Sequence, residues 1–247
     1  MPDHTLTILY RDDYLIAVNK PARLLVHRSA LDRHETSNAL KLLRDQTGCY
    51  LYPVHRLDKP TSGVLLFALN KDTARYLSRL FEEHRVVKHY TAVVRGYCIE
   101  SGEVDHAIRD RDSKHKARVP ATTSYSNLAT IELPVSVDRY PTSRYSILNI
   151  QPLSGRRHQI RMHMKHINHP IIGDTSYGKK VHNSFFSECF NCTRLLLHAQ
   201  SIQLDHPDSS KPLVISAPIV NAEFARVIND TRWCWQNQQD KLQLMSE

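Results

Sequence analysis

The chain has 247 residues and a mass of 28.5 kDa, long enough to bury a core as one large domain or two small ones. Its formal net charge of +8 and isoelectric point near 9.3 favour a polyanionic partner, with nucleic acid the first candidate. No apolar run reaches the roughly 18 residues of a membrane helix, and the first five residues do not resemble a secretion signal. Five cysteines, an odd number, therefore predict free thiols in the cytoplasm.

The first predicted elements are a hairpin and a short helix. Residues 6–10 and 14–18 read as two strands joined by a polar turn, and Pro21 ends the second strand. Residues 36–47 have the apolar spacing of a helix, with Thr36 or Ser37 as its cap and Gly48 just past its end.

A polar loop followed by a buried strand occupies residues 55–69. Residues 64–69 are apolar, follow a glycine and precede an asparagine, so they predict a buried strand. In the loop before it, Asp58 lies between Arg56 and Lys59. A carboxylate near either cation stays ionised at neutral pH and can present a fixed negative charge to a ligand. The structural alternative is a turn leading into the strand, with solvated charges.

An amphipathic helix and a long strand are predicted next. Residues 71–85 place apolar side chains at helical spacing, and residues 86–96 are rich in β-branched residues. Tyr90 lies on this strand, where a tyrosine is more often structural than functional. The mixed-charge run 109–118 indicates either a solvated loop or a basic hairpin that contacts RNA phosphates. Strands are predicted at 122–127, 129–137 and 145–153.

The third informative stretch begins at Ser154. This residue can cap a helix that runs to about His166, before Asn168 and Pro170 end it. Three arginines in this short segment predict a phosphate or carboxylate nearby. Later strands are predicted at 195–199 and 213–215, and the tail from Ala222 onward is partly helical and covers a sheet edge.

Three of these stretches resemble the motifs of the RluA-type pseudouridine synthases, enzymes that isomerise uridine in structured RNA. They are His55-Arg56-Leu57-Asp58 with Thr61-Ser62-Gly63, then Lys88-x-Tyr90 in a strand ending at Gly96, then Ser154-Gly155-Arg156 with His158-Gln159-Ile160-Arg161. They occur in the order of the family. The third stretch departs from the family's usual motif, because Ser154 replaces a threonine and Arg157 adds a charge. The opening hairpin with Asn19-Lys20-Pro21 is also similar.

The resemblance implies an α+β fold, in which helices flank a mixed, mainly antiparallel sheet and an RNA cleft crosses the sheet. It implies that Asp58 is the catalytic residue, that Arg161 pairs with it, and that Tyr90 packs on the target uracil. It places six further residues on the RNA, with Arg56 filling the gap left by the flipped base and Ile160 beside the base: His55, Arg56, Arg156, His158, Gln159 and Ile160. It requires no metal or cofactor, because the product is an isomer of the substrate.

Within the family, the sequence is most similar to the enzymes that modify uridine 65 of tRNA. This similarity depends on the segments 26–29, 31–33 and 139–142 and on the lack of room for an N-terminal RNA-binding domain. We therefore expect a monomeric, cytoplasmic tRNA enzyme built as one catalytic domain over residues 1–247, with a core from about 6 to 218 and a tail from 219. A ribosomal RNA enzyme of the same family and a catalytically silent RNA-binding protein are the alternatives.

Other constellations are weaker. Cys189 and Cys192 have the spacing of half a zinc site, but no second pair accompanies them at finger spacing. The histidines of 158–169 lack a neighbouring carboxylate, so RNA-facing side chains are the simpler interpretation. None of the seven glycines forms a phosphate-binding loop, and the histidine–arginine pair before Asp58 lacks the companions of a kinase loop.

Overall fold

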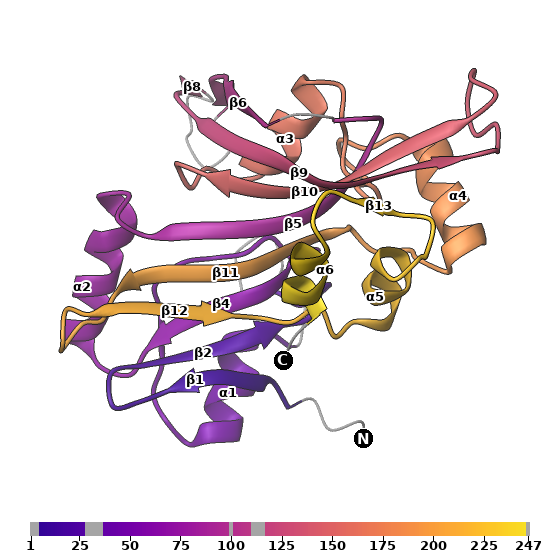
Figure 1. Ribbon diagram of the computed structural model, residues 1–247. Coiled ribbons are helices and arrows are strands. Elements are labelled where there is room, and N and C mark those ends of the chain that lie inside the picture. Colours follow the sequence, from indigo (N-terminus) through magenta and orange to yellow (C-terminus); the bar gives the residue numbers. More distant parts are fainter. Residues whose placement is uncertain (1–4, 28–36, 99–100, 110–116, 246–247) are drawn as a thin grey trace. The chain divides into compact units, whose positions relative to one another are not determined.

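The computed structural model describes residues 5–27, 37–98, 101–109 and 117–245 (Figure 1). They form two compact units. Unit 1 comprises Met1–Lys88 and Ala199–Ala217, and unit 2 comprises His89–His198 and Pro218–Glu247. Both combine mainly antiparallel strands with helices, which confirms the predicted α+β class. No helix in the described part of the chain is long and apolar enough to cross a membrane.

Unit 1 is a sheet with the order β1-β2-β4-β11, in which β12 pairs with β11 and the short β3 pairs with β4 (Figure 1). Its elements are β1 (Thr7–Arg11), β2 (Leu15–Lys20), α1 (Ala39–Thr47), β3 (Tyr52–Pro53), β4 (Ser62–Ala68), α2 (Lys71–Glu82), β11 (Leu197–Asp205, from Ala199) and β12 (Pro212–Ser216). Alternate residues of β2 and β4 pack against Leu77 and Leu80 of α2 in one apolar cluster. All seven residues of β4 are buried, as the apolar run predicted.

Unit 2 has the strand order β5-β10-β9-β13, and β6 pairs with β9 (Figure 1). Its strands are β5 (Val87–Arg95, from His89), β6 (Gly102–Asp105), β7 (Ile108–Arg109), β8 (Arg118–Val119), β9 (Thr122–Leu133), β10 (Ser143–Pro152) and β13 (Cys234–Trp235). Its helices are α3 (Gln159–His166), α4 (Lys180–Phe190), α5 (Ala222–Ile228) and α6 (Gln238–Met245). Helix α3 contributes to one apolar cluster on β5 and β10, whereas α4, α5 and α6 contribute to another.

Several predicted boundaries were wrong for local reasons. Asn38 caps α1, because its side chain accepts the Lys41 N–H; Thr36 lies outside the described residues. Helix α2 ends at Glu82, and His84 adopts a positive φ of 57°. The two strands predicted at 122–127 and 129–137 form one strand, β9. The gap between the two predictions corresponds to a register shift in the pairing of β9 with β10, between Asn127 and Ala129.

Other differences concern the third motif, the tail and the charged run. Helix α3 begins at Gln159, five residues after the expected cap. Helix α4 was not predicted, and in the tail Trp235 lies on β13, which pairs with β9 as the expected edge cover. The charged run starts and ends as the paired strands β7 and β8, but its centre, residues 110–116, lies outside the described residues. Residues 28–36, which include Arg28 and Arg33, also lie outside the described residues.

Gly63 joins the Asp58 loop to β4 and cannot accept a side chain. Its φ is +113°, and a Cβ atom built there lies 2.2 Å from the Ala199 carbonyl oxygen. Gly63→Ala should therefore lower the free energy of unfolding by about 3 kcal/mol or more, from combined backbone strain and overlap. Urea denaturation followed by circular dichroism measures this change.

Gly48 provides the matched control for this substitution. It also has a positive φ, +67°, but nothing lies within 4 Å of the added Cβ. Gly48→Ala should cost only about 1 kcal/mol, the backbone contribution alone. Equal losses for the two variants would show that the approach of Ala199 is not what requires Gly63.

Candidate active site

The Asp58 loop of unit 1 is anchored by backbone and side-chain hydrogen bonds on both sides of the carboxylate. The Asp58 carbonyl oxygen accepts the Thr61 N–H at 3.0 Å, which closes a turn just before β4. Leu57 is buried under the loop, whereas Asp58 is half-buried and Arg56 is exposed. The loop thus holds the Asp58 carboxylate on a fixed backbone. A group that reacts with a bound substrate has to be positioned in this way before the reaction.

Lys20, at the end of β2, is the deepest anchor of this loop. Its side chain is fully buried, and its Nζ donates to the carbonyl oxygens of Pro21, Leu24 and Lys59 at 2.8, 2.8 and 3.3 Å. A buried ammonium group is tolerated only when hydrogen bonds replace its water. The contact with Lys59 therefore ties the residue next to Asp58 to β2. In the sequence, Lys20 was notable only for its place at a strand end and in the family-like segment Asn19-Lys20-Pro21.

His55 stabilises the loop and does not act as a cation. Its Nε2 accepts the Leu66 N–H at 2.9 Å, and its ring stacks on Phe81 with centroids 4.8 Å apart. Burial, together with the nearby charge of Lys88, lowers the pKa of His55 to about 3. The ring is therefore neutral at pH 7, with its proton on Nδ1. Its predicted contact with RNA stays a prediction, but it would be a contact without positive charge.

Tyr90 and Ile160 share one apolar cluster in unit 2. Tyr90 lies on β5, opposite Ile150 of β10, and is half-buried against the cluster. Ile160, on α3, is 7% exposed and belongs to the same cluster. The second and third motifs are therefore brought together by the packing of α3 on β5 and β10. An aromatic ring and an aliphatic side chain in one cluster suit contact with the flat face of a base.

Arg161, next to Ile160, is held by a carboxylate that the sequence analysis did not identify. Its Nε and one Nη donate to Asp174 at 2.7 and 2.9 Å, and both side chains are at least 95% buried. This bidentate geometry fixes the plane of the guanidinium. Burial alone would raise the pKa of Asp174, but the Arg161 hydrogen bonds and charge outweigh it and lower that pKa. The pairing of Arg161 with Asp58 stays a prediction.

Asp174 is positioned by a turn that α4 supports. Its Oδ1 also accepts the N–H groups of Ser176 and Tyr177 at 2.8 and 2.9 Å. Asn183 of α4 accepts the Gly173 N–H and donates to the Asp174 carbonyl oxygen. Asp174 lies within the segment Pro170-Ile171-Ile172-Gly173-Asp174, in which an acid after buried isoleucines was the available signal.

Gln159 and His158 of the third motif make contacts within unit 2. Gln159 is buried; it accepts from Ser154 Oγ at 2.7 Å and donates to the Thr122 carbonyl and Thr123 hydroxyl. His158 Nδ1 lies 3.0 Å from the Tyr177 hydroxyl. These two residues therefore have a positioning role for the loop before α3. Arg156 is exposed, as a contact with RNA phosphates would require, and all three predicted RNA contacts stay predictions.

The described residues contain no group of three or more His, Cys, Asp and Glu side chains arranged to hold a metal ion. What they do present is a carboxylate on an anchored loop in unit 1. In unit 2 they present a half-buried phenol, an aliphatic contact and an oriented guanidinium. A carboxylate can act as nucleophile or base, and a guanidinium can keep a carboxylate ionised and aimed.

The chain is similar in sequence and in structure to known proteins. The family model described as RNA pseudouridylate synthase matches residues 14–166, which include Asp58, Tyr90 and Arg161. The chain is 48% identical over 235 residues to "tRNA pseudouridine synthase C" of Haemophilus ducreyi, covering 92% of this chain and 96% of that protein. It is 49% identical over 220 residues to the protein of that name from Yersinia pestis, covering 86% of each.

A solved structure is similar over nearly the whole chain. "Human RNA Pseudouridylate Synthase Domain Containing 1" aligns with a TM-score of 0.72 and 25% identity, covering 98% of this chain and 94% of that one. The family model spans more than half of the chain and all three motifs, and close relatives match it nearly end to end. The chain therefore belongs to the RNA pseudouridylate synthase family.

Proposed function

We propose that this protein converts a uridine of tRNA to pseudouridine. The observation that carries the proposal is the family match over residues 14–166, with the carboxylate, phenol and guanidinium of the three motifs all present. The names of the relatives, which specify tRNA, support the substrate. The similarity of segments 26–29, 31–33 and 139–142 favours position 65. A tRNA substrate places the enzyme in the cytoplasm, where we propose that it acts as a monomeric catalytic domain.

The reaction requires the uridine to leave the RNA stack, because neither its C5 nor its glycosidic carbon is accessible there. Asp58 either attacks the sugar or abstracts one of its protons, and the N1–C1′ bond breaks. The detached uracil turns and forms the C5–C1′ bond. In the first route the ester bond between Asp58 and C1′ breaks as this bond forms, and in the second route Asp58 returns the abstracted proton to the sugar. C5 then loses its proton, and N1 gains one, so the product is an isomer of the substrate. In this proposal Tyr90 packs on the uracil and assists loss of the C5 proton.

Arg161 would act on Asp58 from a guanidinium that Asp174 already orients. A guanidinium carries five N–H donors, and Asp174 accepts from two of them in Arg161. A charge-assisted hydrogen bond from Arg161 would keep Asp58 ionised throughout the reaction. Arg56, exposed on the same loop as Asp58, would fill the gap that the flipped base leaves.

Mapping of modified uridines tests this function. Total RNA from a strain that lacks the gene should lose pseudouridine at one tRNA position, and the wild-type gene should restore it. Loss at a ribosomal RNA position with intact tRNA would identify the ribosomal alternative instead. For the silent RNA-binding alternative, purified protein would release no tritium from tRNA labelled at C5 of uridine, although it binds that RNA.

A further inference from the structure

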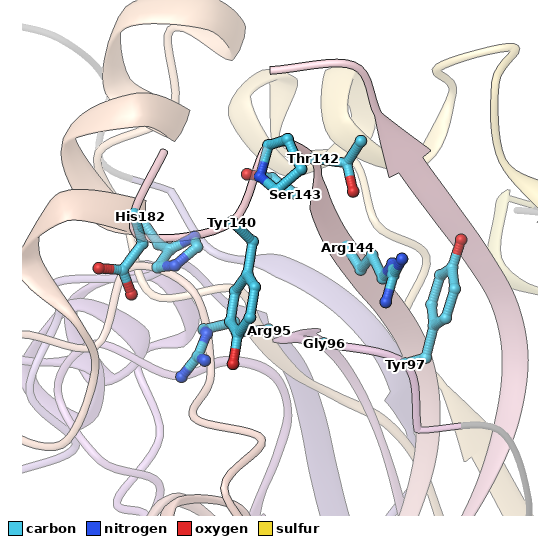
Figure 2. Close-up of a pocket in the computed structure, with 10 residues that line it drawn as sticks. Arg95, Gly96, Tyr97, Tyr140, Thr142, Ser143, Arg144 and His182 are labelled. Atoms are coloured by element: carbon cyan, nitrogen blue, oxygen red, sulfur yellow. The ribbon is translucent and has the colours of Figure 1, made fainter. Parts of the chain in front are cut away.

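Unit 2 contains a pocket that the proposed chemistry does not use. It has a volume of about 390 Å³ and lies where β5 ends and the β9–β10 hairpin turns back. Figure 2 shows Arg95, Tyr140, Thr142, Arg144 and His182 around it. Tyr140 and Thr142 belong to segment 139–142, one of the segments similar to the enzymes that modify uridine 65 of tRNA. A pocket of this size accommodates a group as large as a nucleotide.

His182 supplies a buried hydrogen-bonding atom whose partner is missing. The side chain is 5% exposed, and its Nδ1 lies 2.9 Å from the Tyr145 hydroxyl oxygen. The tautomer of the imidazole sets the direction of this hydrogen bond. In either tautomer Nε2, as a donor or as an acceptor, has no hydrogen-bond partner among the described residues. A buried polar atom without a partner is costly, so a ligand with a complementary polar group would be favoured here.

The neutral state of His182 makes it a hydrogen-bonding group but not a counter-ion. Burial, and then the charge of Arg95, lowers the pKa of His182 to about 4. Protonation is thus disfavoured in the physiological range. The positive charge that an anionic ligand would need must come from other groups of the pocket.

Arg95 supplies that charge. Within the described part of the chain, no carboxylate lies at ion-pair distance from its guanidinium, whereas Arg144 and Asp138, which also line the pocket, are paired. Arg144 pairs with Glu132 at 3.2 Å, and the lining carboxylate Asp138 pairs with Lys179. With Arg139 included, the cations around the pocket outnumber its carboxylates, so the charge favours an anion.

Tyr140 adds an aromatic surface. Its side chain is 56% exposed, far more than a tyrosine that serves the core, and the Arg139 guanidinium lies 5.5 Å from its ring centroid. An exposed aromatic ring beside arginines is typical of sites on which a nucleic-acid base stacks. A free phosphate would need only Arg95 and His182, and a carboxylate ligand would not need the ring.

We propose that this pocket binds one nucleotide of the RNA substrate at a position other than the target uridine. The base stacks on Tyr140, the phosphate contacts Arg95, and a polar group of the nucleotide hydrogen-bonds to His182 Nε2. This assignment rests on the proposed RNA substrate. It gives segment 139–142 a role in recognising the RNA outside the reacting residue.

Filter binding of an unmodified tRNA transcript tests the pocket. Tyr140→Ala should weaken binding about tenfold, the usual cost of one lost base stack, whereas Tyr140→Phe should bind as the wild type does. Arg95→Gln should weaken binding and reduce the slope of log affinity against log salt by about one, the contribution of one phosphate contact. Arg79→Gln, at an exposed arginine of α2 in unit 1, is the control for lost surface charge.

The results separate this proposal from the enzymatic function. Wild-type affinity and salt dependence in Tyr140→Ala and Arg95→Gln would overturn it, and so would a Tyr140→Phe variant as weak as Tyr140→Ala. A loss in Arg79→Gln equal to that in Arg95→Gln would also overturn it, because the effect would then be general charge. If the protein made no pseudouridine but the variants lost affinity as expected, the pocket would stand and the proposed function would fall.

Discussion

Asp58→Asn should abolish pseudouridine formation while leaving RNA affinity nearly unchanged. Asparagine preserves the size of the side chain, and the anchors of the loop are backbone groups, His55 and Lys20, so the fold should persist. An amide can neither attack the sugar as a carboxylate does nor accept its proton. We expect the rate to fall by more than about a thousandfold, about 4 kcal/mol of transition-state stabilisation. Tritium release from tRNA labelled at C5 of uridine, at saturating enzyme, measures this rate.

Asp205→Asn is the matched control for that experiment. Asp205 also lies in unit 1, is 40% exposed, and pairs with Arg85 at the surface. Its replacement removes the same charge and should leave the rate within about twofold of the wild type, because exposed ion pairs contribute little. Appreciable turnover by Asp58→Asn would show that another residue performs the chemistry.

Asp174→Ala should be among the most destabilising substitutions in unit 2. It leaves the guanidinium of Arg161, 5% exposed, without its bidentate partner. Removal of one member of a buried ion pair costs roughly 3–5 kcal/mol, because the remaining charge is desolvated and unpaired. It also removes the acceptor of the Ser176 and Tyr177 N–H groups. The change appears as a lower urea midpoint at an unchanged dependence on urea.

The exposed ion pair of Arg75 and Asp72 is the control for the effect of burial on the free energy of unfolding. Its N–O distance is also 2.7 Å, but its side chains are 77% and 91% exposed. Asp72→Ala should therefore leave the urea midpoint almost unchanged, although the ion-pair geometry is equally short. If Asp174→Ala were as mild as Asp72→Ala, Arg161 would not depend on Asp174 for its position.

Arg161→Ala should in turn lose pseudouridine formation.

Local patterns in the sequence predicted much of the fold. The apolar run 64–69 is the buried strand β4, and the helical spacing from Lys71 corresponds to α2. These predictions succeeded because a helix that buries one face has apolar residues at a regular spacing, and a strand that buries both faces is a continuous apolar run. Boundaries failed where one hydrogen bond or one turn decides the end, as at Asn38 and His84. Helix α4 was not predicted, because Lys179 at its N-cap is not a typical capping residue and its mixed composition shows no clear apolar period.

The sequence by itself determined the family, the three motifs and the residue types that they bring to the reaction. Only the tertiary structure decided how those residues are held. Lys20 reaches the carbonyl oxygen of Lys59, Arg161 meets Asp174, and Tyr145 hydrogen-bonds to His182, 37 residues further along the chain. Such partners follow no period along the chain, because they meet only when sheet and helices pack and bring buried polar groups within hydrogen-bond distance.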